Sequence, residues 1–219
     1  MTEDNIGNIR MINADCVEVL KSLPDTSFAL AIVDPPHGLG EGGKDKNRRR
    51  QGEVKRTAYK DGSQWDNSIP NKEYFEELYR ISKNQIIFGA NYMTEFIPPS
   101  MGWIVWDKGI AGDFSDCELA YSSFKRALRK VYVHYMADYN GKWEQKIHPC
   151  QKPIGLYRWI LENYANAGDK ILDTHFGSGS LGIACDDLGF ELTAIERDPD
   201  YFKATKNRII EYRRQLKLF

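Results

Sequence analysis

Short apolar segments alternate with helical patterns along the chain, and this alternation limits the possible folds more than any other feature. Strands that alternate with helices form a mostly parallel sheet covered by helices on both faces. We therefore expect an α/β, doubly wound fold whose ligand lies beyond the carboxyl ends of the strands. The expected strands are 28–34, 85–88, 103–106, 171–174 and 192–196, and the expected helices are 72–82, 155–165, 181–188 and 201–216.

Two stretches interrupt this alternation within what we expect to be a single domain, residues 1–219. Residues 41–64 are polar, rich in glycine and without apolar periodicity, so we expect a flexible basic loop. Residues 107–147 contain aromatic, strand-like pieces at 118–124 and 130–136. They indicate a small insertion or an antiparallel extension of the sheet.

Bulk composition limits the partners and the compartment. The formal net charge is −1 and the pI about 6.4, so any contact with nucleic acid requires a local basic patch. No apolar run approaches the roughly 20 residues of a transmembrane helix. The four cysteines are far apart and form no CxxC pair, which favours reduced thiols and no metal. We expect a cytoplasmic protein with no membrane contact.

A glycine-rich turn follows the strand expected at 171–174. Its glycines, Gly177 and Gly179, allow close approach of a ligand to the backbone, although many such turns bind nothing. Glu196 ends the next strand, where an acid can accept hydrogen bonds from ribose hydroxyls, or can simply begin the last helix. Since the turn is neither GxGxxG nor a P-loop, S-adenosyl-L-methionine (SAM) is favoured over NAD or ATP.

The tetrapeptide Asp34-Pro35-Pro36-His37 ends the first expected strand and is the most specific signal in the chain. An exocyclic amine of adenine or cytosine is a poor nucleophile because its lone pair is delocalised into the ring. A carboxylate and a backbone carbonyl that accept its two N–H groups draw the nitrogen toward a tetrahedral geometry. A flat side chain in the fourth position can stack on a base extruded from the duplex. The alternative is a strand end in which Asp34 only caps a turn.

Four segments resemble the amino-group (N6-adenine/N4-cytosine) DNA methyltransferases. The sequence DPPH is similar to their (D/N/S)PP(Y/F/W) motif, HPCQKP at 148–153 to HP-x-QKP, residues 173–179 to DxFxGxG, and residues 13–20 to GDC-xx-xL. The catalytic motif precedes the cofactor motif, which is the β order of the family. The resemblance spans about residues 13 to 202 and is weakest at 41–64 and 107–147. It implies a circularly permuted, seven-stranded Rossmann-like SAM-dependent methyltransferase fold with a small insertion.

The resemblance also implies site residues. Asp34, Pro35, Pro36 and His37 would hold the target amine and base. His37 departs from the family, in which this position is aromatic and usually tyrosine. The residues implied for the cofactor are Asp15, Cys16, Asp34, Gln151, Lys152, Asp173, Thr174, His175, Phe176, Gly177, Ser178, Gly179, Glu196 and Arg197. Among these, Lys152 would lie near the cofactor carboxylate or be solvated, and His175 is favoured as a partnered strand-end histidine.

Two basic patches are candidates for contact with double-stranded DNA. In residues 44–56, seven basic residues minus two acidic ones leave a charge of +5, suited to phosphates or merely to a solvated loop. A second patch lies among aromatic residues of 107–147, the expected target-recognition region. The DNA-binding candidates are Lys44, Lys46, Arg48, Arg49, Arg50, Lys55, Arg56, Lys125 and Arg126.

These features predict a site-specific DNA adenine-N6 methyltransferase of the kind found in restriction–modification. Asp34 in place of serine favours adenine in the family, and cytosine-N4 methylation is the nearest alternative. RNA or protein amide methylation is a weaker alternative. A weakly active DNA-binding relative, in which His37 marks lost activity, belongs to a different class. We expect a stand-alone, phage- or prophage-like methylase that forms a homodimer as β-ordered relatives often do.

Overall fold

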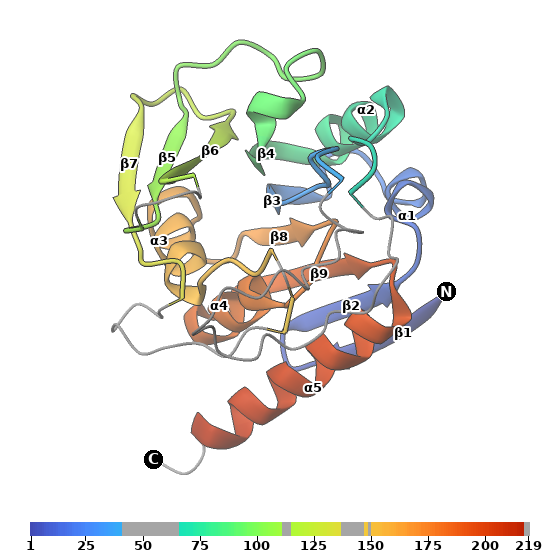
Figure 1. Ribbon diagram of the computed structural model, residues 1–219. Helices are drawn as coiled ribbons and strands as arrows, with labels where there is room; N and C mark the ends of the chain where they lie inside the picture. Colours follow the sequence, from blue (N-terminus) through green and yellow to red (C-terminus); the bar gives the residue numbers. More distant parts are fainter. Residues whose placement is uncertain (41–65, 111–114, 137–146, 149, 217–219) are drawn as a thin grey trace.

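The described residues of a computed structural model are 1–40, 66–110, 115–136, 147–148 and 150–216. In this part of the chain nine strands form one sheet, shown in Figure 1, in the order β1-β2-β9-β8-β3-β4-β6-β5-β7. The strands are β1 (Thr2–Ile6), β2 (Ile9–Asn13), β3 (Phe28–Val33), β4 (Ser82–Phe88), β5 (Ile104–Asp107), β6 (Cys117–Ser122), β7 (Arg129–Tyr132), β8 (Lys170–Asp173) and β9 (Glu191–Glu196).

Helices cover both faces of the sheet (Figure 1). One apolar core joins α1 and α2 to one face, and a second joins α3, α4 and α5 to the other. Alternate residues of β3 divide between the two cores, since Leu30 and Ile32 enter one while Ala31 and Val33 enter the other. The helices are α1 (Cys16–Ser22), α2 (Lys72–Ile81), the short 3₁₀ helix η2 (Ala90–Tyr92), α3 (Ile154–Tyr164), α4 (Ser180–Leu188) and α5 (Pro199–Leu216).

The doubly wound α/β class and the mostly parallel sheet are confirmed. Strands β2, β9, β8, β3 and β4 run parallel to one another, and β6 is antiparallel to β4 and β5. The expected seven strands correspond to the seven inner ones, from β2 to β5. Two further strands extend the edges, because β1 forms a hairpin with β2 and β7 pairs parallel to β5.

The five expected strands and four expected helices lie within a few residues of observed elements. The N-terminal elements β1, β2 and α1 were not predicted as secondary structure. Strand β1 is polar and mostly exposed, so its sequence lacks the apolar signal of a buried strand. Its position is set instead by the tight turn at Gly7, where φ is +60°.

The expected extension at 107–147 contains β6 and β7, both within the main sheet. The expected flexible loop at 41–64 lies outside the described residues. In the described part, no helix is long and apolar enough to cross a membrane. No group of three or more His, Cys, Asp or Glu side chains in that part could hold a metal ion.

The carboxyl ends of the parallel strands bring the predicted motifs to one edge of the sheet, called here the carboxyl edge. Asp34 follows β3, while Asp173 and Glu196 end β8 and β9. Strand β6 runs in the opposite direction, so its first residues, including Glu118, lie at this same edge. The fold thus gathers residues from positions 15 to 196 around one site.

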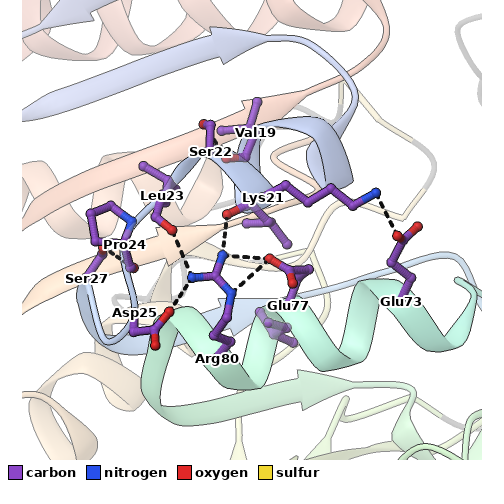
Figure 2. A network of polar contacts seen from close by, with 12 residues as sticks. Val19, Lys21, Ser22, Leu23, Pro24, Asp25, Ser27, Glu73, Glu77 and Arg80 are labelled. Carbon is purple, nitrogen blue, oxygen red and sulfur yellow. Dashed lines mark hydrogen bonds and ion pairs between the residues drawn. The ribbon is translucent and has the colours of Figure 1, made fainter.

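An arginine network fastens α1 and α2 at the opposite edge, called here the amino edge (Figure 2). Arg80 of α2 donates to the carbonyl oxygens of Leu20 and Leu23, each at 2.9 Å, and pairs with Asp25 and Glu77, each at 2.6 Å. The C-terminal end of α1 leaves backbone carbonyls without helical partners. Arg80 donates to two carbonyls there, of which Leu20 O also accepts from Leu23 N at 3.1 Å, and it connects the two helices.

Candidate active site

Asp34 lies at one end of a charge cluster at the carboxyl edge, and Lys152 connects it to the rest of the cluster. Lys152 Nζ is 2.5 Å from Asp34 Oδ2 and 3.4 Å from Glu118 Oε2. Lys108 Nζ lies 2.8 Å from Glu118 Oε1. The charge cluster therefore contains two lysines and two carboxylates, brought together from four separate segments of the chain.

The charge cluster fixes the ionisation of Asp34. Burial alone would raise the pKa of this carboxyl group, but the charge of Lys152, aided by His37, outweighs it and holds the pKa well below its usual range. Burial acts against Lys152 as well, yet Asp34 and Glu118 keep the pKa of the ammonium above its usual value. Asp34 is consequently a carboxylate, able to accept hydrogen bonds, throughout the neutral range.

The Lys152 side chain is buried and paired with carboxylates of the protein, and its contact with a cofactor carboxylate stays a prediction. Its side chain is 4% exposed, so it is not solvated, and its ammonium group points to Asp34 and Glu118. The ammonium also lies 4.6 Å from the centre of the Phe88 ring. The physical reason is that a buried carboxylate requires a counter-charge, and Lys152 supplies it to Asp34.

Three buried polar atoms around Asp34 have no hydrogen-bond partner: Asp34 Oδ1, His37 Nε2 and Glu118 Oε2. Asp34 Oδ1 and His37 Nε2 are 3.5 Å apart, too far for a good hydrogen bond. Buried polar atoms are normally paired. An unpaired acceptor on a permanently ionised Asp34 is the arrangement that a hydrogen-bond donor from a ligand can complete.

The turn that carries His37 is fixed by a residue that the motifs did not reveal. Asp66 is buried, and its carboxylate accepts hydrogen bonds from the backbone N–H groups of His37 (2.8 Å) and Gly38 (3.0 Å). Its carbonyl oxygen accepts from Gly40 N at 2.9 Å. Asp66 lies far along the chain from Asp34, after the polar segment, and no local pattern marks it.

The glycine turn connects β8 to α4. Gly177 and Gly179 have φ values of +50° and +75°, and a Cβ added at Gly179 would collide with Thr205 of α5. Arg208 of α5 donates to Ser178 O at 2.7 Å and to Ser180 Oγ at 3.0 Å. Phe176 is buried in the core at the start of the turn. Helix α5 thus holds the turn in place.

Asp173, at the end of β8, is a buried carboxyl group beside this turn. It accepts a hydrogen bond from His175 N at 3.0 Å, and no lysine or arginine of the described chain forms an ion pair with it. Burial raises its pKa to about 8, although the hydrogen bond from His175 acts in the opposite direction. Asp173 is therefore suited to a cationic group of a ligand.

Glu196 and Asp15 occupy neighbouring strand ends, since Asn13 of β2 pairs with Glu196 of β9. The Glu196 carboxylate accepts hydrogen bonds from Gly177 N and Asp198 N, each at 2.8 Å, which fix its orientation and leave further lone pairs. Asp15 caps α1 by accepting from Val17 N at 3.0 Å, and Arg197 lies 3.9 Å from its other oxygen. The roles of Glu196 and Asp15 toward a ribose and its base stay a prediction.

His175 is held on several sides by the protein. Its Nδ1 lies 2.9 Å from Thr174 Oγ1, which in turn is 2.7 Å from the Tyr74 hydroxyl, and its Nε2 is 4.0 Å from Cys16 Sγ. Burial lowers the pKa of His175 to about 4. These contacts favour the partnered strand-end histidine over a ligand-binding one.

Residues 150–153 of the HPCQKP segment lead into α3. Buried Gln151 accepts a hydrogen bond from Ile147 N at 3.0 Å, so its amide braces the segment that presents Lys152. The His148 ring meets the edge of Tyr201 at 4.5 Å between centres, which ties the segment to α5. Pro153 precedes the first residue of α3, Ile154.

The two groups of DNA-binding candidates have different outcomes. Lys44, Lys46, Arg48, Arg49, Arg50, Lys55 and Arg56 lie outside the described residues. Lys125 and Arg126 are exposed but follow the end of β6, at the amino edge and away from Asp34. Arg126 also donates to Asn163 O and lies over the Tyr164 ring. Contact of Lys125 and Arg126 with DNA stays a prediction.

The chain belongs to the family of DNA methylases, because the model of the N6-adenine/N4-cytosine methylase family matches residues 41–207. Among its relatives is the type II methyltransferase M.HpaI of Haemophilus parainfluenzae. That protein is 27% identical over 249 residues, which cover 91% of this chain and 74% of M.HpaI. The type II methyltransferase M2.LlaDCHI of Lactococcus lactis subsp. cremoris is 22% identical over 241 residues, covering 92% and 89%.

Solved structures show the same fold. The M1.HpyAVI–SAM complex has a TM-score of 0.59 at 20% identity and covers 91% of this chain and 99% of that one. The cytosine-N4-specific PvuII DNA methyltransferase has a TM-score of 0.62 at 12% identity, covering 92% and 86%. At this level of identity the likeness concerns the fold alone, and the target base has to be argued from the site.

Proposed function

We propose that the chain methylates the N6 amino group of adenine in double-stranded DNA, with SAM as the methyl donor. Membership of the DNA methylase family provides the broader class, a SAM-dependent methyltransferase acting on an amino group. The observation that carries the proposal is Asp34, an ionised carboxylate with one buried, unpaired oxygen at the end of β3. That oxygen is suited to one N–H of an exocyclic amine.

The residues at the carboxyl edge fit the proposed cofactor. SAM supplies, when bound, an electrophilic methyl group on a positively charged sulfur. Asp173 offers a buried carboxyl group without a cationic partner in the described chain, which suits the ammonium group of a methionine. Glu196, oriented by its backbone donors, would accept from the ribose hydroxyls. The positive-φ turn at Gly177 leaves its backbone open to close approach.

Asp34 would act as a hydrogen-bond acceptor and not as a strong base. Since Lys152 holds its pKa low, Asp34 does not remove a proton from a neutral amine. It would orient the amine, with the carbonyl of Pro35 as the second acceptor, so that the nitrogen lone pair is released from the ring. The amine becomes acidic once methylated, and its proton then leaves without a strong base.

The segments around the carboxyl edge suit recognition of the bases near the target. The chain leaves the sheet at this edge after β5 and again after β7, because Asp107 pairs with both Cys117 and Tyr132. The segments that follow belong to residues 107–147, which we propose as the target-recognition region.

A homodimer, cytoplasmic location and stand-alone role remain sequence-based predictions.

Methyl transfer from tritiated SAM to unmethylated duplex DNA, followed by nucleoside analysis, tests the proposal. N6-methyladenine is the expected product. N4-methylcytosine would establish the second candidate function, cytosine-N4 methylation. DNA binding without methyl incorporation would instead indicate the weakly active relative and contradict the proposal.

A further inference from the structure

Four acidic residues at the carboxyl edge share a backbone contact that Asp34 lacks. Each lies at or just after the end of a strand, β2, β5, β8 or β9, and accepts a hydrogen bond from the backbone N–H two residues later. The contacts are Asp15 with Val17 N (3.0 Å), Asp107 with Gly109 N (3.0 Å), Asp173 with His175 N (3.0 Å) and Glu196 with Asp198 N (2.8 Å). A strand-end acid in this protein therefore pairs with its own turn, as short acidic side chains commonly do.

Asp34 follows β3 but cannot form this contact, because the residue two positions later is Pro36. Proline has no backbone N–H, and Pro35 lacks one for the same reason. The first N–H after Asp34 belongs to His37. Asp34 Oδ2 pairs with Lys152 at 2.5 Å, whereas Asp34 Oδ1 has no hydrogen-bond partner.

Asp66 takes the next two donors of the turn. Its Oδ1 accepts hydrogen bonds from His37 N at 2.8 Å and from Gly38 N at 3.0 Å. An acidic side chain can also cap the N–H three residues later, so His37 N is the donor that Asp34 would otherwise reach first. Asp66 is 3% exposed and comes from a distant part of the chain. The backbone donors nearest to Asp34 are thus either missing or already bonded.

We propose that Pro36 and Asp66 are positioning residues that withhold backbone donors from Asp34, so that its Oδ1 stays unpaired until an amine reaches it. Pro36 presents no N–H at the position where the other four strand-end acids find one. Asp66 occupies the two N–H groups that follow. This inference rests on the proposed function, since it requires Asp34 to accept a hydrogen bond from an exocyclic amine.

The first test compares two substitutions at position 36 that differ in the N–H. In Pro36→Ala the new N–H lies two residues after Asp34 and should bond to Asp34 Oδ1, as in the other strand ends. We expect kcat in the tritium assay to fall about ten- to hundredfold, the range of one hydrogen bond to a charged group. N-methylalanine at the same position, introduced by cell-free translation, lacks both the proline ring and the N–H. It should recover most of the lost kcat, and KM for SAM should stay unchanged in both proteins.

Nuclear magnetic resonance can detect the new contact without turnover. In Pro36→Ala protein labelled with ¹⁵N-alanine, the amide proton of residue 36 should lie downfield of its position in the Pro36→Ala/Asp34→Ala double variant. A hydrogen bond to a carboxylate is short and strong, and it deshields the donated proton. The same resonance position in the two proteins would show that Asp34 does not take the new N–H, and would overturn the inference.

The second test concerns Asp66. Asp66→Ala releases the N–H groups of His37 and Gly38 and should also lower kcat, whereas Asp66→Asn keeps an acceptor oxygen and should recover most of that loss. The assays belong below the melting temperature of every variant, so that unfolding does not lower kcat.

The outcomes separate this inference from the proposed function. Pro36→Ala protein with the kcat of the wild type would overturn this inference alone, and so would an equal loss with alanine and N-methylalanine. N4-methylcytosine as the product would overturn the adenine target and leave this inference standing, because cytosine carries the same kind of amine. Wild-type protein that methylates no DNA would overturn both.

Discussion

Two ion clusters, one at the amino edge and one at the carboxyl edge, differ in whether all their buried polar atoms are hydrogen-bonded. At the amino edge, Arg80 directs its donors at two carbonyls and two carboxylates and closes the junction of α1 and α2 (Figure 2). At the carboxyl edge, the charge cluster around Lys152 leaves Asp34 Oδ1 without a hydrogen-bond partner, and Glu118 Oε2 has only an ion contact with Lys152 at 3.4 Å.

This difference is informative because a buried polar atom without a hydrogen-bond partner destabilises the folded protein. A buried acceptor without a partner costs on the order of 1–3 kcal/mol. The carboxyl edge tolerates several such atoms, whereas none of those in the Arg80 network is among them. We infer that Asp34 Oδ1, which lies beside the predicted motifs and has no hydrogen-bond partner, is where a ligand completes the structure.

The largest expected effect is that of Asp34→Ala, which removes the unpaired acceptor. Turnover should fall on the order of 10³-fold, as when a preorganised hydrogen-bonding group is lost from an active site. SAM affinity should remain largely intact, which calorimetry can measure beside the tritium assay. Asp34→Asn is the conservative control, since it keeps the volume and loses the charge. Near-normal turnover in Asp34→Ala would remove Asp34 from the mechanism.

Lys152→Met should have the next largest effect and should change the pH profile. Without the ammonium, burial would raise the pKa of Asp34 above its ordinary value. Asp34 would then be partly protonated at neutral pH, and activity should recover as the pH rises and the carboxylate forms. Breaking a buried pair also costs about 3–5 kcal/mol of stability, so the assay belongs at low temperature.

Lys108→Met is the matched control for Lys152→Met. Lys108 contacts Glu118 and does not contact Asp34, so the pH profile should move far less. A profile that shifts equally in both variants would mean that bulk charge, and not the direct Lys152–Asp34 contact, sets the state of Asp34.

Arg80→Ala should lower the stability of the folded protein and leave kcat unchanged. The variant leaves the carbonyls at the end of α1 to water, and the melting temperature should drop by several degrees. At a temperature where it remains folded, kcat should equal that of the wild type. Thermal unfolding measures the change in melting temperature, and the tritium assay measures kcat. If kcat falls by more than the loss of folded protein explains, the amino edge also contributes to catalysis.

A smaller effect concerns the pH dependence of SAM affinity. The pKa of Asp173 is raised to about 8, so the carboxyl group holds a proton over most of the range from pH 4 to 8. Binding of an ammonium group favours the ionised form and releases that proton. Affinity should therefore rise with pH below about 8, and Asp173→Asn should flatten this rise. Calorimetry in buffers of different ionisation enthalpy measures the released proton.

The motifs were predictable from the sequence because each is local. The residues at the ends of β3, β8 and β9 follow apolar runs, and parallel strands necessarily bring their carboxyl ends together. Glu118 and Asp66 were not predicted as site residues. Each reaches the site through sheet register or a returning loop, and no spacing in the sequence encodes those contacts.

Charge alone was a poor guide to location. Lys125 and Arg126 follow aromatic residues in a pattern typical of nucleic-acid contact, yet the antiparallel direction of β6 carries them to the amino edge. Lys152 was predicted near the site, but its partner depended on which carboxylate lay closest in space. The tertiary structure determines where a charged side chain lies and which group it pairs with.

The strand order also governs when the protein can fold. Strand β2, near the start of the chain, lies between β1 and β9, and Ile9 pairs with Leu192. During synthesis on a ribosome, β2 must wait for almost all of the later chain before its parallel partner emerges. Contacts of such long sequence separation slow folding and expose unpaired edges meanwhile. We expect the nascent chain to depend on chaperones until β9 is complete.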